Sequence, residues 1–361
     1  PQLRGSLGTG KSLSFVSPPE IHSPCHPAEE KLMNLFLTRI FLALAISTGG
    51  ICTASHAAQA QASKASAINP AYQAALDEAV VLLDSWRGDS SVLNAARAKL
   101  DGILRSDPNV AAAHREYARY YIMSGYISGS MGTPASLAAA ERSLNEALRL
   151  NPNYAEAYVL AGHLFVLQDR LADAMNALSK AKSIGTADPW LPLNTAHVLI
   201  AQGNIGEAVS NYQSVIASGT KNSKAMLAAF SGLIKIYESR GEFQKVDETY
   251  RRQIAYEPQS AWLYGNYAAF LLCTKDDAEA AIIQFRRALE RMNYGMARSG
   301  LAAAAYRKLA TNPGERQSSD EKQLLREAQS FRAGTPIEVV TSFCRGGPAV
   351  LAMQKASAQQ P

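Results

Sequence analysis

The stretch YVLAGHLFVLQDRLADAMNALSKAKSIGTADP, residues 158–189, decides the fold of this chain. It contains two spaced patterns, Y-x2-A-G-x2-F at 158–165 and A-x3-L-x2-A at 174–181, and it ends at Pro189. Each spacing gathers apolar residues on one face of a helix. Proline cannot continue a helix, so the chain turns at that point. The stretch therefore predicts two short helices that pack against each other.

The same pattern returns 34 residues later along the chain. Gly162 and Ala174 of the first copy correspond to Ala196 and Ala208 of the second. These small residues allow the two helices of a pair to approach closely, while larger side chains fill the spaces on either side. A single helix pair cannot bury its own apolar face, so a fixed period of this length predicts a stack of helix pairs.

The spacing resembles the tetratricopeptide repeat (TPR) pattern, W-x2-L-G-x2-Y, then A-x3-F, then P. The resemblance implies an all-α fold, a right-handed α-α superhelix or solenoid of about six helix pairs with C-terminal capping helices. The second pair carries an insertion at Gly125–Pro134 between its helices. The expected repeats occupy residues 72–108, 109–152, 153–189, 190–223, 226–258 and 261–293.

The pattern weakens after the sixth repeat. Residues 295–332 still read as helices, and we expect them to cap a solenoid that spans 61–332. Ser319 is the expected N-cap of the last of these helices, with Lys322 in the place where a capping box would have Glu. Residues 333–361 are expected to form a tail, disordered at its end.

The N-terminal region predicts a secretory signal peptide that starts at Met33. A short basic segment is followed by the apolar core 40–46 and by small-residue cleavage sites ending at Ala57 or Ala60. Residues 33–60 are therefore assigned to the signal, and residues 1–32 to an upstream leader outside the translated protein. A membrane span needs about 20 apolar residues, so no transmembrane span is expected after cleavage. The expected location is the periplasm or the exterior of a bacterium.

A phosphate-binding pattern, G-x4-G-K-S, occurs at residues 5–12. Such a loop requires a buried strand before it and a helix after it. Only four residues precede this copy, and Pro18 and Pro19 follow it closely. We expect no nucleotide site here.

Two of the four cysteines, Cys273 and Cys344, remain once the signal peptide is removed. In an oxidising compartment two cysteines can form a disulfide. The alternative is that Cys273 is a small core residue and Cys344 is a free thiol in the tail. The sequence leaves both alternatives open.

Composition argues against several classes of function. The formal net charge is +5, from 36 basic and 31 acidic residues, and no basic tail is present, so nucleic acid is not an expected partner. No HExxH, GxSxG or CxxC spacing occurs. His163 and His197 occupy the same place in adjacent repeats, but no third metal ligand accompanies them. We therefore expect no catalytic residue, no cofactor and no metal.

The TPR resemblance implies that the first helices line a concave groove, and residues just after each crossing position should face it. Arg119, His163, His197 and Lys235 form a basic or titratable row, with a mostly apolar row three residues further on. Such a groove suits an acidic and apolar peptide or helix. The alternative is an ordinary solvated helix face. The candidate groove residues are Arg115, Arg119, His163, Val166, His197, Ile200, Lys235 and Glu238.

The sequence thus predicts a non-catalytic interaction scaffold or assembly factor of the bacterial cell envelope. Its expected partner is another protein, bound in the concave groove. The alternative function is a ligand-binding or accessory subunit that recognises an acidic peptide or glycan for an envelope enzyme.

Overall fold

The computed structural model describes residues 69–127, 132–310 and 318–358. All of the described residues belong to one compact unit, residues 64–361. The expected leader and signal peptide, residues 1–60, lie outside the described residues. So do residues 128–131 of the Gly125–Pro134 insertion.

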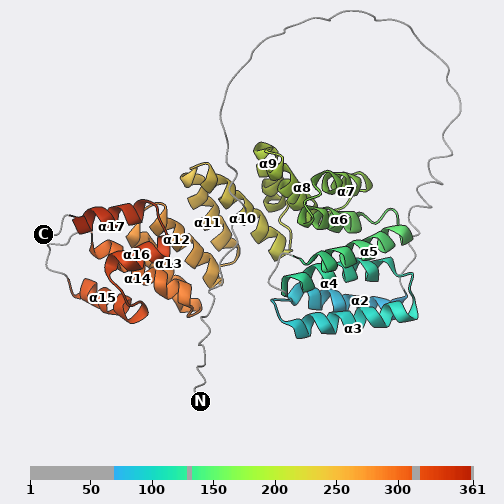
Figure 1. Cartoon of the computed structure of the whole chain (residues 1–361), viewed down its shortest axis with the longest axis horizontal. Helices are drawn as coiled ribbons and strands as arrows, with labels where there is room; N and C mark the ends of the chain where they lie inside the picture. The colour runs from blue at the N-terminus through green and yellow to red at the C-terminus, as the bar shows by residue number, and fades with distance from the viewer. Residues whose placement is uncertain (1–68, 128–131, 311–317, 359–361) are drawn as a thin grey trace, which may run out of the picture. The chain divides into compact units, whose positions relative to one another are not determined.

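The described residues form helices and turns, and no strand occurs among them (Figure 1). Each repeat contributes a first and a second helix. The first helices are α2 (Pro70–Ser85), α4 (Ala111–Ile127), α6 (Ala155–Leu167), α8 (Trp190–Ala201), α10 (Ser223–Ser239), α12 (Ala261–Cys273) and α14 (Gly295–Leu309). The second helices are α3 (Ser90–Ser106), α5 (Pro134–Leu150), α7 (Leu171–Ile184), α9 (Ile205–Ala217), α11 (Phe243–Tyr256), α13 (Ala278–Arg291) and α15 (Ser319–Phe331). The predicted all-α solenoid of stacked helix pairs is confirmed.

The two helices of a pair pack against each other, as α4 does with α5 and α12 with α13 (Figure 1). First helices also contact the next first helix along the stack, from α2 through α4, α6 and α8 to α10. Within the described part of the chain, no two second helices are in comparable contact. The first helices from α2 to α10 therefore form one layer, and α12 contacts α14 in the same way, while the second helices are spread apart. This asymmetry places the first helices on the inner, concave side of the stack.

Small residues lie where the paired helices cross. Gly162 is buried in α6, and a Cβ atom added to it would lie 2.5 Å from Leu178 Cγ of α7, closer than side chains tolerate. Close packing leaves no room there for a larger side chain. The alanines at the corresponding positions are all fully buried: Ala118, Ala196 and Ala268 in first helices, and Ala140, Ala174, Ala208 and Ala281 in second helices.

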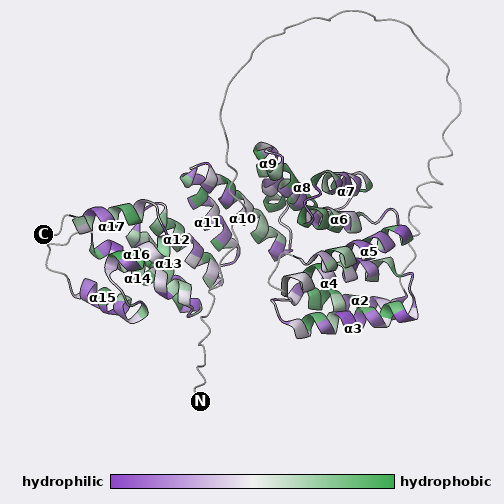
Figure 2. Cartoon of the chain, viewed as in Figure 1, coloured by the Kyte–Doolittle hydropathy of each residue, from purple (hydrophilic) through white to green (hydrophobic). Residues whose placement is uncertain are grey.

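Apolar side chains fill the interior on either side of these crossings. The largest cluster runs from Leu193 to Met353 and contains the fully buried Tyr212 and Phe285. Smaller clusters lie within the earlier pairs. Hydrophilic and hydrophobic residues alternate along α3 and α5 in Figure 2, as expected for helices with one buried face. The core is thus shared between neighbouring pairs along the stack.

The C-terminal region differs from the prediction of a tail. Two more helices follow α15, namely α16 (Pro336–Cys344) and α17 (Pro348–Ala358), and the helix reaches residues that we expected to be disordered. Val340 and Ala349 in these helices are fully buried. A disulfide joins Cys344 at the end of α16 to Cys273 at the end of α12, with a Cα–Cα distance of 5.2 Å. This segment folds because its apolar residues cover the last helix pairs.

The start of α15 also corrects the sequence analysis, by one residue. The N-cap is Ser318, not Ser319. The Ser318 hydroxyl accepts a hydrogen bond from the backbone N–H of Glu321, whose carboxylate accepts one from the Ser318 N–H. This is a complete capping box. Moving the frame back by one residue puts Glu321 in the position where Lys322 had been expected.

No helix in residues 69–127, 132–310 or 318–358 is both long and apolar enough to cross a membrane.

Candidate functional site

Four successive first helices carry the predicted row on their inner side. We call Arg119 of α4, His163 of α6, His197 of α8 and Lys235 of α10 the inner row. The positive charge of Lys235 lowers the pKa of His197, and His197 lowers the pKa of His163. Charges influence each other in this way only at short range. The three members from α6 to α10 are therefore neighbours in space.

The two histidines of the inner row are neutral at pH 7. Burial, together with the neighbouring His197, lowers the pKa of His163 to about 4. Burial first and Lys235 second also lower the pKa of His197. The His197 ring is exposed to water, yet protein surrounds it on several sides, with the Tyr212 ring 6.1 Å away in an edge-on contact. The histidines can donate or accept a hydrogen bond but contribute no positive charge.

Acidic side chains neutralise the two arginines at the α4 end of the inner row. Arg119 forms an ion pair of 2.7 Å with Glu116, which is almost fully buried, and another with Asp84 at the end of α2. Arg115 also pairs with Glu116. Buried carboxylates of this kind need a cation partner. Arg115 and Arg119 therefore serve first to neutralise Glu116, and they are less available to an acidic ligand than expected.

Lys235 is the open cation of the inner row. Its side chain is exposed and makes no ion pair or hydrogen bond within the part of the chain that the structure describes. Glu238, one turn further along α10, is half-buried, and burial raises the pKa of its carboxyl group while Lys235 opposes that change. The pair leaves a weakly charged surface at this end of the row.

Apolar side chains lie beside the inner row. Ile200, one turn beyond His197 in α8, is 36% exposed. Val166 holds the same place in α6 and is partly buried. The amide Nδ2 of buried Asn194 donates a hydrogen bond of 3.2 Å to the Val159 carbonyl and so links α8 to α6. The surface thus combines a fixed framework with exposed apolar and polar groups.

Among the described residues, no group of three His, Cys, Asp or Glu side chains is placed to hold a metal ion.

Sequence reasoning missed the acidic partners of the arginines. Glu116 follows Arg115 directly and precedes Arg119 by three residues, a spacing that brings helix side chains together, so this pairing could have been found. Asp84 lies 35 residues before Arg119 in another helix. No local pattern carries that information.

No profile of a known protein family matches this chain. The chain is similar to the human protein "Protein O-mannosyl-transferase TMTC3", with 29% identity over 152 residues. That match covers 40% of this chain, and the chain spans only 16% of the length of TMTC3.

Among solved structures, the chain is similar to PilW, titled a "widely conserved type IV pilus biogenesis factor", with 19% identity, 71% of this chain and 99% of PilW covered, and a TM-score of 0.42. It is also similar to yeast Tom70, with 13% identity and a TM-score of 0.48. That match covers 82% of this chain and 65% of the Tom70 chain. YrrB, titled "a TPR protein with an unusual peptide-binding site", shows 16% identity, 55% and 95% coverage, and a TM-score of 0.35. The fold assignment rests on the helix pairs described above, and these similarities add nothing about ligand or partner.

Proposed function

We propose that this chain is a non-catalytic interaction scaffold or assembly factor that binds a segment of another protein along the inner row. The observation that carries the proposal is the position of the partly exposed Ile200 one turn from the neutral His197 in α8, with the open Lys235 on the adjoining first helix α10 close enough to act on His197. Protein-binding surfaces commonly combine apolar contact residues with polar groups around them. The suitable ligand is an apolar segment with an acidic group for Lys235.

The proposed location is the bacterial cell envelope, where the partner would also reside. Two features support it. Residues 33–60 have the pattern of a secretory signal, although they lie outside the described residues. The Cys273–Cys344 disulfide would persist in an oxidising compartment and would be reduced in the cytosol.

Site-specific photo-cross-linking tests the proposed binding surface. A photoreactive amino acid replaces Ile200 on the inner side, and in a matched variant it replaces Ser210, an exposed residue of the second helix α9. After irradiation of intact cells, we expect a discrete protein adduct with the Ile200 variant only. Identical adducts from both positions would refute the inner site. An adduct that contains glycan in place of protein would favour the accessory-subunit alternative.

A further inference from the structure

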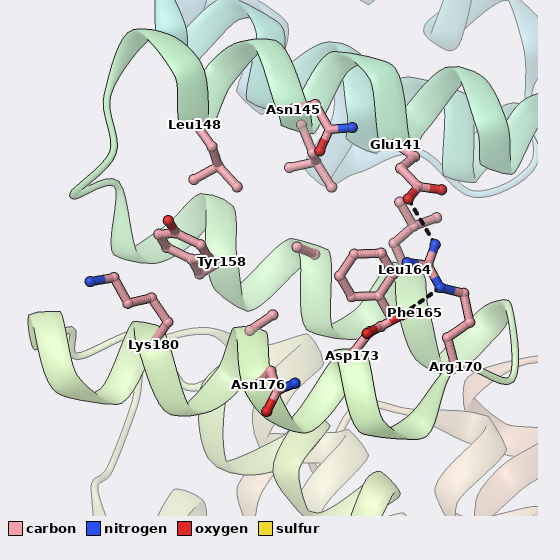
Figure 3. A pocket seen from close by; sticks show the side chains of 13 residues that line it. Glu141, Asn145, Leu148, Tyr158, Leu164, Phe165, Arg170, Asp173, Asn176 and Lys180 are labelled. Atoms are coloured by element: carbon pink, nitrogen blue, oxygen red, sulfur yellow. Dashed lines mark hydrogen bonds and ion pairs between the residues drawn. The ribbon is translucent and has the colours of Figure 1, made fainter.

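A cavity lies on the side of the helix stack that the second helices form, away from the inner row. Its walls are the second helices α5 and α7, and α6 forms its floor, as Figure 3 shows. The cavity has a volume of about 340 Å³ and opens to solvent. It exists because second helices of neighbouring pairs spread apart while first helices stay in contact. We refer to it as the outer trough.

The floor of the outer trough is apolar. Small side chains, Ala161 of α6 and Ala177 of α7, leave the space open. Leu148, Tyr158 and Phe165 line it and are only partly buried. An apolar hollow of this kind gains free energy by taking up an aliphatic or aromatic side chain.

One end of the outer trough is closed by its own ion pairs. Arg170 pairs at 2.7 Å with Glu141 of α5 and at 2.7 Å with Asp173 of α7 (Figure 3). The Arg170 guanidinium also lies 4.3 Å from the centre of the Phe165 ring. Because these charged groups pair with one another, they hold α5 and α7 at a fixed spacing at this end of the trough.

The other end carries an open cation. The side chain of Lys180 in α7 is exposed and makes no ion pair or hydrogen bond within the described ranges of the chain. Between the two ends, Asn145 of α5 and Asn176 of α7 lie on opposite walls (Figure 3). Both amides are exposed and have no hydrogen-bond partner in the described structure. Each amide offers two donors and one acceptor group.

We propose that the outer trough binds an extended peptide segment of a partner protein, with an apolar side chain next to an acidic one. The apolar side chain enters the hollow over Phe165, the carboxylate pairs with Lys180, and the two asparagines bond the peptide backbone. An extended chain presents unpaired backbone N–H and C=O groups to which these amides can hydrogen-bond, whereas the backbone groups of a helix are already hydrogen-bonded to each other. Lining positions from Glu141 to Leu148 span about 10 Å of helix, room for about three extended residues.

The test uses a phage-displayed library of random heptapeptides, panned against the immobilised full chain. The recovered peptides are synthesised with a fluorescent label, and their affinity is measured by fluorescence anisotropy. We expect them to carry an acidic residue beside an apolar one. Lys180→Glu should weaken binding at least tenfold, because attraction becomes repulsion. Lys182→Glu, an equal charge reversal at an exposed position of the same helix, should change it less than twofold.

Two further variants separate this site from the other surfaces. Replacing both Asn145 and Asn176 by Ala should also weaken binding, while Lys235→Glu in the inner row should have no effect, so the two sites succeed or fail independently. The proposal is overturned by failure to enrich any such peptide, by equal losses from Lys180→Glu and Lys182→Glu, or by loss from Lys235→Glu. A concentration-dependent dimer broken by Lys180→Glu would assign the trough to a second copy instead.

Discussion

Gly162 shows how strongly a single residue is constrained in this fold. A Cβ atom at Gly162 would lie 2.5 and 2.6 Å from Leu178 atoms of the opposing helix. We expect Gly162→Ala to destabilise the protein by about 1–3 kcal/mol, because overpacking forces the helices apart. Gly102, also inside a helix, has nothing within 4 Å, so Gly102→Ala should stabilise by about 0.5–1 kcal/mol through helix propensity. Urea unfolding measures the free energy of unfolding of both variants. A change of the same sign in both would contradict the close contact of α6 and α7 at Gly162.

His163 provides a residue-scale prediction about pH. Its pKa in the folded protein is about 4, below the ordinary 6.5, so between these values the unfolded chain binds more protons than the folded one. Stability is therefore full above pH 6.5 and falls as the pH is lowered toward 4. A tenfold change in proton affinity is worth about 1.4 kcal/mol, and partial exposure of the ring reduces the effect.

The measurement compares unfolding free energies at pH 7 and pH 5 in the original protein and in His163→Gln, which cannot titrate. The variant should lose less stability on acidification. An equal loss in the two proteins would show that His163 is solvated and titrates normally.

At the scale of a helix, the start of α15 gives a test in which neighbouring serines differ. Ser318 completes the capping box, whereas Ser319 contacts only the adjacent Asp320 side chain. Ser318→Ala should destabilise α15 by about 1 kcal/mol, because an orphan backbone N–H loses its partner. Ser319→Ala should be nearly silent. Hydrogen exchange of α15 measures the effect of both substitutions. A greater loss of protection in Ser319→Ala than in Ser318→Ala would show that Ser319 is the N-cap.

The disulfide connects two elements that lie far apart in the sequence. Cys273 and Cys344 are separated by 71 residues, and a crosslink over such a loop contributes about 4 kcal/mol in the chain-entropy model. Protein secreted into an oxidising compartment, then unfolded without reductant, should react with no thiol reagent. Reduction should raise hydrogen exchange in α16 and α17 while leaving α4 to α7 unchanged. Two reactive thiols in the unreduced material would contradict the pairing.

The elements that the sequence revealed are those with a local signal. The helix pairs can be predicted from periodic small and apolar residues such as Gly162 and Ala174, because the same close contact between two helices recurs in each pair. The folding of α16 and α17 could not be predicted, because their apolar residues are buried only by packing against α12 and α14, which lie far away in the sequence. The compensation of Arg119 by Asp84 depends on a contact across 35 residues. The outer trough results from the spreading of second helices, which no repeat pattern expresses.

At the scale of the whole molecule, the layer of first helices from α2 to α10 presents polar and apolar side chains on a single surface. In the proposed function, binding depends on this surface as a whole. Charges at such a face matter little for folding but strongly for binding. Substitutions of exposed residues of the inner row should therefore change the affinity for the partner while leaving the stability of the fold nearly unchanged.

The most direct test reverses the one open cation of the inner row. Lys235→Glu is compared with Lys182→Glu, an exposed reversal on a second helix, and the amount of cross-linked partner recovered from cells is quantified for both. We expect at least a tenfold loss with Lys235→Glu, less than a twofold change with Lys182→Glu, and equal melting temperatures. Capture by the original protein should weaken as salt is added, since exposed charges are screened beyond about 8–10 Å at 0.1–0.15 M. Undiminished capture by Lys235→Glu, or an equal loss in both variants, would contradict binding at the inner row.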